Sequence, residues 1–305
     1  MTSFSSLVRA SADLFVTVLL ILACSCTTTE QRGDTGGAQM ATLRPDVPPD
    51  PMPAPAPAPG AERNSDEEMA MKLANPIANL ISAPIQYNYD HDFGVADDVH
   101  RSLLNVQPVV PFELNADWNL ISRTILPVTW TDDVPSGTGN EFGIGDVEQS
   151  AFFSPKALTA GGATWGVGPV LLLPTATEST LGGEKWGAGP TGVILWQDGP
   201  WTYGGLGNHL WSFAGDDNRS DVNATFLQPF LAYATKSAMT FSFNSESTYD
   251  WISSDWLIAM NAVVSQLVTI GEQKVNLSVG VRHWAESPDV GPEGLGLRLA
   301  CTLLF

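Results

Sequence analysis

The sequence predicts an antiparallel up-and-down transmembrane β-barrel of about twelve strands, preceded by a signal and a disordered linker. Three observations favour this all-β fold. Segments of about 10 to 14 residues recur between turns, the connections between them alternate between short and long, and tryptophans mark the two ends of several segments. Helical periodicity is poor from residue 74 onward, because glycine or proline interrupts nearly every window.

Residues 1–26 have the character of a secretory signal. Arg9 precedes an apolar run, Leu14–Ala23, that is far shorter than the roughly 20 residues needed to span a bilayer as a helix. Ile21-Leu-Ala-Cys24 resembles a lipobox, so Cys24 is a candidate for lipidation, with an ordinary cleaved signal as the alternative. Either way, the sequence predicts export.

Residues 27–72 are predicted to be a disordered linker. Eight prolines lie between Pro45 and Pro59, and the later ones alternate with alanine. Such a segment prefers the extended polyproline conformation and has too little apolar surface to build a core. We therefore expect a spacer that leads to a barrel formed by residues 73–305.

The barrel strands follow one another with turns between them. The predicted ranges are 84–93, 102–113, 117–131, 141–153, 161–174, 184–197, 199–213, 222–235, 238–251, 254–270, 273–285 and 293–305. Short links such as 271–273 alternate with longer ones such as 174–183, although 154–160 is intermediate. Short periplasmic turns, longer outer loops and an even strand count are typical of barrels in the bacterial outer membrane.

Aromatic residues lie where such a barrel meets the membrane interfaces. Trp186 and Trp196 fall on one face near the two ends of 184–197, and Trp118 and Trp130 do the same on 117–131. Strands of this length, tilted by about 40°, cover roughly 25 Å of apolar height. The alternative, a soluble sandwich with core aromatics, gives no reason for two tryptophans so far apart on one side.

The closing strand also fits this location. Leu295–Phe305 alternates apolar and more polar residues, with Leu304 as the one large apolar exception on the second face. An aromatic Phe305 at the end resembles the signal that the outer-membrane barrel assembly machinery reads. We expect this machinery to be a partner.

Several motifs resemble one family. These are Asp117-Trp-Asn-Leu-Ile-Ser-Arg-Thr124, Trp165-Gly-Val-Gly-Pro169, Glu184-Lys-Trp-Gly-Ala-Gly-Pro190 and Thr225-Phe-Leu-Gln-Pro-Phe230. They resemble the outer-membrane family named for the meta-cleavage pathway of phenol degradation, over about 73–305. The resemblance implies a transporter of small molecules without established catalytic residues, and only the family name points to aromatic or other hydrophobic cargo.

Charged residues on strands are predicted to face the lumen, because a charge on the lipid face costs about 2–4 kcal/mol near the midplane for Arg or Lys. The predicted pore-lining residues are Arg123, Asp146, Glu148, Glu246, Arg282 and Arg298. Two interpretations stay open. These side chains either line a water-filled path and set its selectivity, or pair across a narrow barrel and satisfy one another.

Charge narrows the range of partners. The net charge of −19 excludes nucleic acid as a plausible partner. The expected partners are outer-membrane lipids, lipopolysaccharide and a small-molecule solute. We expect no cofactor and no metal site, since Asp216–Asp221 lacks the spacing of a calcium loop.

Alternatives to passive diffusion of a solute remain. A scaffold or adhesion barrel needs no open lumen. A lipid hydrolase needs a nucleophile beside a histidine, but His209 and Ser212 fall on opposite faces of one strand. The sequence therefore predicts a channel and no enzyme.

Overall fold

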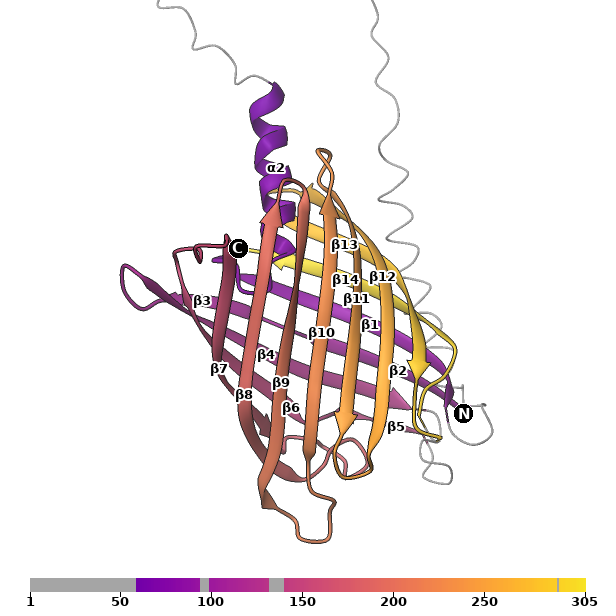
Figure 1. Cartoon of the computed structure of the whole chain (residues 1–305). Helices are drawn as coiled ribbons and strands as arrows, with labels where there is room; N and C mark the ends of the chain where they lie inside the picture. Colours follow the sequence, from indigo (N-terminus) through magenta and orange to yellow (C-terminus); the bar gives the residue numbers. More distant parts are fainter. Residues whose placement is uncertain (1–58, 94–98, 132–139, 290) are drawn as a thin grey trace, which may run out of the picture. The chain divides into compact units, whose positions relative to one another are not determined.

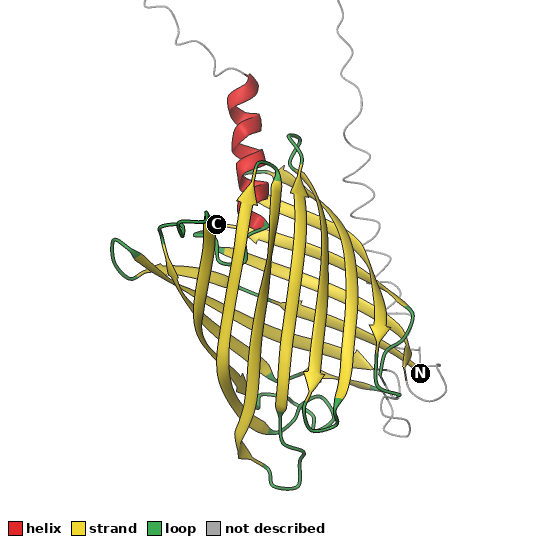
Figure 2. Ribbon diagram, in the orientation of Figure 1, coloured by secondary structure: helices red, strands yellow, loops and turns green. Residues whose placement is uncertain are grey.

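The computed structural model describes residues 59–93, 99–131, 140–289 and 291–305. The predicted signal, the lipidation candidate Cys24 and the linker up to residue 58 lie outside the described residues. The described part forms strands and one helix (Figure 2).

The strands form a closed antiparallel barrel (Figure 1), which confirms the predicted fold class. Each strand pairs with its neighbour along the chain, and β1 closes the cylinder on β14 from Ser82↔Leu304 to Tyr89↔Leu297. The bounds are β1 Ser82–Phe93, β2 Val99–Val106, β3 Val109–Glu113, β4 Trp118–Thr131, β5 Glu141–Ile144, β6 Val147–Pro155, β7 Ala163–Leu173, β8 Lys185–Asp198, β9 Trp201–Gly215, β10 Asn223–Ala234, β11 Met239–Asp250, β12 Asp255–Ile270, β13 Gln273–Glu286 and β14 Leu295–Leu304. The barrel has twelve strands because β2 with β3, and β5 with β6, are two interrupted strands.

The first interruption lies between β2 and β3, at Gln107 and Pro108. Proline has no N–H to give to a sheet ladder, which ends β2 there. The amide of Gln107 still donates to the carbonyl of Pro84 at 2.8 Å, so the chain stays beside β1. Alternate residues therefore keep facing inward from β2 into β3.

The second interruption is a bulge between β5 and β6. β4 pairs Val128 with Ile144 on one side of the gap and Ile125 with Glu148 on the other. The two pairings differ by one residue, so the gap at Gly145 and Asp146 holds one extra residue. A bulge of this kind inverts which residues of the strand face inward.

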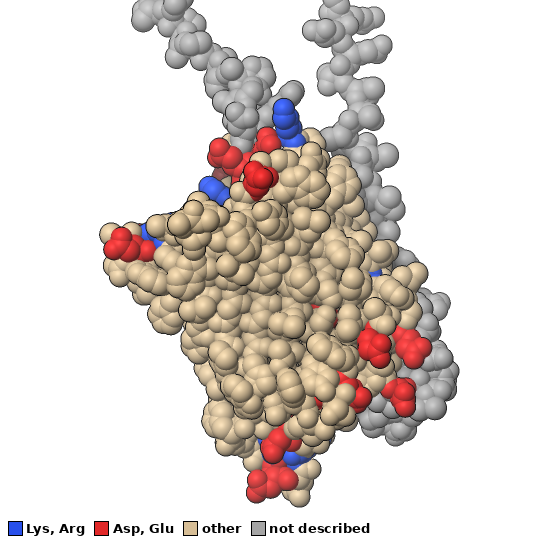
Figure 3. Space-filling view, in the orientation of Figure 1, with Lys and Arg blue, Asp and Glu red and all other residues tan. Residues whose placement is uncertain are grey.

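The outer surface is apolar between its two ends. Phe241, Val279 and Leu297 are among the large apolar side chains that remain exposed there. On the face shown in Figure 3, charged side chains gather towards the ends. Aromatic pairs lie near both ends, as in Trp201 with Tyr233 (centroids 4.8 Å apart) and Tyr249 with Trp256 (4.9 Å). The surface suits contact with lipid.

The connections differ between the two ends. The short-turn end has links 199–200, 235–238 and 271–272, and the long-loop end has links 174–184, 216–222 and 287–294. The link 251–254 at the long-loop end is short, because β11 continues to Asp250 and β12 begins at Asp255.

Helix α2, Pro59–Leu73, lies at the short-turn end (Figure 1), in the region where the sequence predicts a disordered linker up to residue 72. Proline is favourable as a first helical residue, and Ser65–Lys72 contains good helix formers. Ala70 is buried against Ala234, Leu267 and Leu304. No helix within the described residues has the length and apolar character to cross a bilayer.

Candidate functional site: the lumen

The lumen contains two cavities that adjoin. Their volumes are about 320 Å³ and 260 Å³. Four residues line both cavities: Gln107, Arg123, Gln228 and Asn244. The first cavity also reaches the end of α2, and the second reaches the charged residues of β6, β11, β13 and β14.

Residues 74–81, which we call the plug segment, occupy part of the lumen between α2 and β1. Ala74, Pro76, Ala78 and Leu80 line the first cavity. The segment is compact because the amide of Ala78 donates to the carbonyl of Asn75 at 3.1 Å, and the Asn75 side chain accepts from the amide of Ile77 at 3.0 Å. The plug segment therefore narrows the lumen on the side of α2.

Ile77 anchors the plug segment on an apolar wall. Its side chain is only 4% exposed and belongs to a cluster with inward-facing residues of four strands: Ile121, Phe152, Val193, Leu195 and Leu206. Gly166 lies beneath it, and a Cβ at that position would lie 3.4 Å from Ile77 Cδ1. Burying such a side chain contributes about 1.5–3 kcal/mol, which holds the segment in place.

Helix α2 has its own polar contacts with the short-turn end. Lys274 forms an ion pair with Asp66, and the Gln197 side chain donates to the carbonyl of Met71 at 2.9 Å. The ion pair is partly exposed and contributes little on its own. Most of the attachment therefore comes from apolar packing around Ala70 and Ile77.

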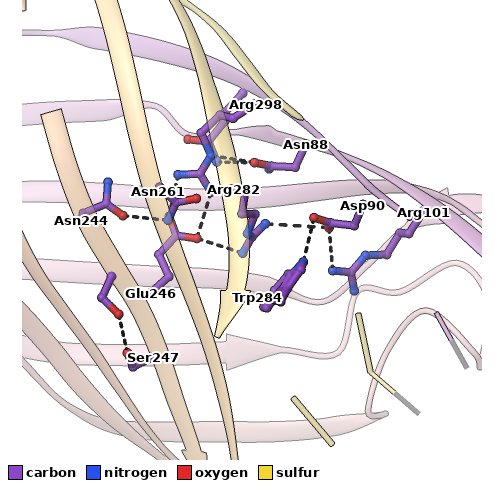
Figure 4. Close-up of polar contacts among 12 residues, drawn as sticks. Asn88, Asp90, Arg101, Asn244, Glu246, Ser247, Asn261, Arg282, Trp284 and Arg298 are labelled. Carbon is purple, nitrogen blue, oxygen red and sulfur yellow. Dashed lines mark hydrogen bonds and ion pairs between the residues drawn. The ribbon is translucent and has the colours of Figure 1, made fainter. Parts of the chain in front are cut away.

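The opposite wall carries a network of charges centred on Glu246 (Figure 4). Arg298 binds this carboxylate with two parallel hydrogen bonds of 2.9 Å, and Arg282 adds a third at 3.0 Å. Asn88 accepts from Arg298 Nε at 2.8 Å. A bidentate ion pair of this kind fixes both the position and the orientation of the guanidinium group.

Asp90 extends the network towards the long-loop end. Its carboxylate is fully buried, and it accepts from Arg101 at 3.1 Å and from the indole of Trp284 at 3.1 Å. Arg282 lies 3.9 Å from Asp90 and stacks over the Trp284 ring at 4.2 Å. A buried carboxylate needs such partners, because desolvation of an unpaired charge costs several kcal/mol.

Arg123 and Glu148 face the second cavity from neighbouring strands. Arg123 donates to the Gln107 side chain at 3.0 Å, and Glu148 accepts from Asn208 at 3.3 Å. Among the described residues no ion pair within 4.0 Å joins Arg123 to a carboxylate.

The structure places five of the six predicted pore-lining residues on the second cavity: Arg123, Glu148, Glu246, Arg282 and Arg298. Asp146 does not join them. It lies in the bulge, where its carboxylate accepts from the amides of Ala176 at 3.1 Å and Gly183 at 2.6 Å. The prediction assumed an unbroken strand over 141–153, and the extra residue turns Asp146 towards a loop.

Sequence reasoning missed Asn88, Asp90 and Arg101. Polar residues alternate with Tyr87 and Tyr89 on β1, so the inward phase could have been inferred from the two tyrosines. The pairing of Arg101 with Asp90 depends on the β1–β2 register, which the sequence alone does not give.

The side chains considered for hydrolysis lie apart. His209 is 2.7 Å from the hydroxyl of Thr225, whereas Ser212 donates to Asp221 at 3.1 Å. Within the described part of the chain, no three His, Cys, Asp or Glu residues form a group that could hold a metal ion. Phe305 is exposed, and its amide donates to the carbonyl of Ile81 at 3.0 Å.

Comparison with models of protein families gives no match, and no curated protein matches in sequence. The resemblance to the phenol-degradation family therefore stays a prediction.

Solved structures are similar in fold. The COG4313 outer membrane channel from Pseudomonas putida F1 has a TM-score of 0.60 at 14% identity, covering 74% of this chain and 96% of that one. The Salmonella typhi outer membrane phospholipase has a TM-score of 0.44 at 13% identity, covering 79% and 98%. The closed barrel with its apolar outer surface, together with the similar fold of the COG4313 outer membrane channel, defines a β-barrel protein of the bacterial outer membrane.

Proposed function

We propose that this barrel is an outer-membrane channel through which small molecules diffuse passively. The observation that carries the proposal is the pair of adjoining cavities inside the barrel, of about 320 Å³ and 260 Å³. An engineered cavity of about 150 Å³ is enough to bind benzene. Each cavity therefore has room for a molecule with a single ring.

The lining supports solutes with an aromatic or otherwise apolar body. Val109 and Phe230 face the first cavity, and Phe226 faces the second. Polar groups of Gln107 and Asn244 lie beside these apolar side chains. Mixed lining of this kind is typical of small-molecule sites, in which a few polar groups orient a ligand on apolar surface.

The plug segment sets how far this path is open. Ile77 holds it on the apolar wall, so weakening that contact should widen the lumen without touching the charged network. Ile77→Asp places a charge against apolar side chains. Asn79→Asp introduces the same carboxylate at an exposed position of the same segment and serves as the control.

The test is single-channel recording in planar bilayers with the full chain. We expect the wild-type protein to conduct, Ile77→Asp to conduct at least about twofold more, and Asn79→Asp to match the wild type. Silence from all three proteins, with the barrel folded, would reject the channel and favour a scaffold or adhesion barrel.

A further inference from the structure

Arg123 differs from the other arginines of the charged lumen. Arg101, Arg282 and Arg298 each form an ion pair with Asp90 or Glu246. The hydrogen bond that the structure gives Arg123 goes to the neutral amide oxygen of Gln107, at 3.0 Å. A guanidinium group carries five N–H donors, so most of those of Arg123 are left for water or a solute.

The position of Arg123 is also particular. It lines both cavities and therefore lies where they adjoin. A solute that passes from one cavity to the other passes this guanidinium group. The plug segment lines the first of the two cavities. Arg123 lines the same cavity, so a solute in that cavity reaches Arg123 while the plug segment stays in place.

Apolar side chains line the two cavities together with this cation. Phe226 and Phe230 lie two residues to either side of Gln228 on the inward face of β10, and Val109 packs against the same apolar cluster. A single-ring body fits the volumes given above. The arrangement places a positively charged group beside apolar surface, which suits a solute with a charged group and an apolar body.

The charge balance in this part of the lumen favours an anion. Four arginines (Arg101, Arg123, Arg282 and Arg298) face three carboxylates (Asp90, Glu148 and Glu246), which leaves one positive charge in excess. Asp90 and Glu246 are already bonded to guanidinium groups, and Glu148 accepts from Asn208. The excess is local, since the whole chain carries −19.

We infer that Arg123 binds the carboxylate of small organic acids whose aromatic or aliphatic body rests on Phe226 and Phe230. This inference names the class of solute for the proposed channel, and the role of the site in transport rests on that proposed function. Arginine binds a carboxylate with two parallel hydrogen bonds, which gives both strength and orientation. Small monocarboxylates are therefore the preferred solutes that this site indicates for the channel.

Equilibrium binding by calorimetry tests the site with the full chain in detergent. Benzoate is the probe, and benzamide is the neutral molecule of the same shape. We expect benzoate to bind at least about tenfold more tightly than benzamide, because a charge-assisted hydrogen bond is stronger than a neutral one. Equal affinities, or no binding of benzoate, would overturn the inference without the need for any variant.

Variants assign the effect to Arg123. Arg123→Gln should remove the preference for benzoate, and Lys236→Gln, which removes a positive charge from an exposed turn, should retain it. Arg123→Lys keeps the positive charge but lacks the planar guanidinium group that makes two parallel hydrogen bonds, so it should retain only part of the preference for benzoate. A preference that survives in folded Arg123→Gln, or is unchanged in Arg123→Lys, contradicts the assignment.

The two proposals fail in different ways. Benzoate binding at Arg123 without conductance in bilayers would reject the channel and keep the site. Conductance without benzoate binding would keep the channel and reject the site.

Discussion

At the scale of single residues, Glu246 is the centre of the charged wall. It is shared by Arg298 and Arg282, which are themselves less than a tenth exposed. Removing one member of such a group leaves the others buried without their counter-charge, which costs more than the intact pair contributes. The network therefore fixes β11, β13 and β14 relative to one another.

We predict that Glu246→Gln lowers the free energy of unfolding by about 3 kcal/mol, since it leaves both arginines without this carboxylate. Thermal unfolding of the folded barrel in detergent, followed by circular dichroism, measures the change. Glu113→Gln is the matched control, because Glu113 pairs with Lys156 at an exposed position. A loss no larger than in this control would show that the network does not stabilise the barrel.

At the scale of elements, two neighbouring strands approach closely at a glycine. On β8, Gly189 precedes Pro190, and a Cβ at Gly189 would collide with the carbonyl oxygen of His209 on β9. The β8–β9 ladder has matched pairs on both sides of this point, at Ala188↔Trp211 and Thr191↔Asn208. Only glycine permits this approach while the register is kept.

Gly189→Ala should therefore force β8 and β9 apart. We expect a loss of about 1–3 kcal/mol, in the range for overpacking a dense site. The unfolding midpoint in urea, measured in lipid vesicles, would show it. Gly192→Ala is the control, since a Cβ there meets its nearest atom at 3.5 Å, an ordinary contact. Equal midpoints for the two variants would refute the role of Gly189.

At the scale of the whole molecule, the barrel presents an apolar outside and a charged inside. Val279 on β13 is 45% exposed, while the adjacent Ser278 and nearby Arg282 are buried. This distribution suits a cylinder that excludes charge from hydrocarbon and gathers it in a polar lumen. The same distribution gives the two cavities their mixed lining.

A charge on the outer face should be costly in lipid. We predict that Val279→Arg lowers the free energy of unfolding in vesicles by about 2–4 kcal/mol, the cost of arginine near the bilayer midplane. Ala157→Arg places the same side chain in an exposed link between β6 and β7 and should change little. The folding yield as a function of urea concentration measures the stability of both variants. Similar losses of stability in the two variants would place Val279 outside the hydrocarbon core of the membrane.

The sequence by itself determined the architecture of the barrel. Period-two alternation, turn residues and end-placed tryptophans predicted the strand ranges because each depends on residues close together in the chain. They also placed Arg282 and Arg298 on the inward faces of their strands. Leu304 was out of pattern because it packs inward against Ala70 of α2, a contact between distant parts of the chain.

Only the tertiary structure decided what the lumen contains. The bulge that removes Asp146 from it, the register that pairs Arg101 with Asp90, and the burial of Ile77 against five strand residues all depend on how separate strands meet. One residue of shift between strands inverts every side chain beyond it, and local patterns do not record such shifts. The lumen is formed by contacts across the closed cylinder, so its shape and its charge pairing became visible only once β1 had closed on β14.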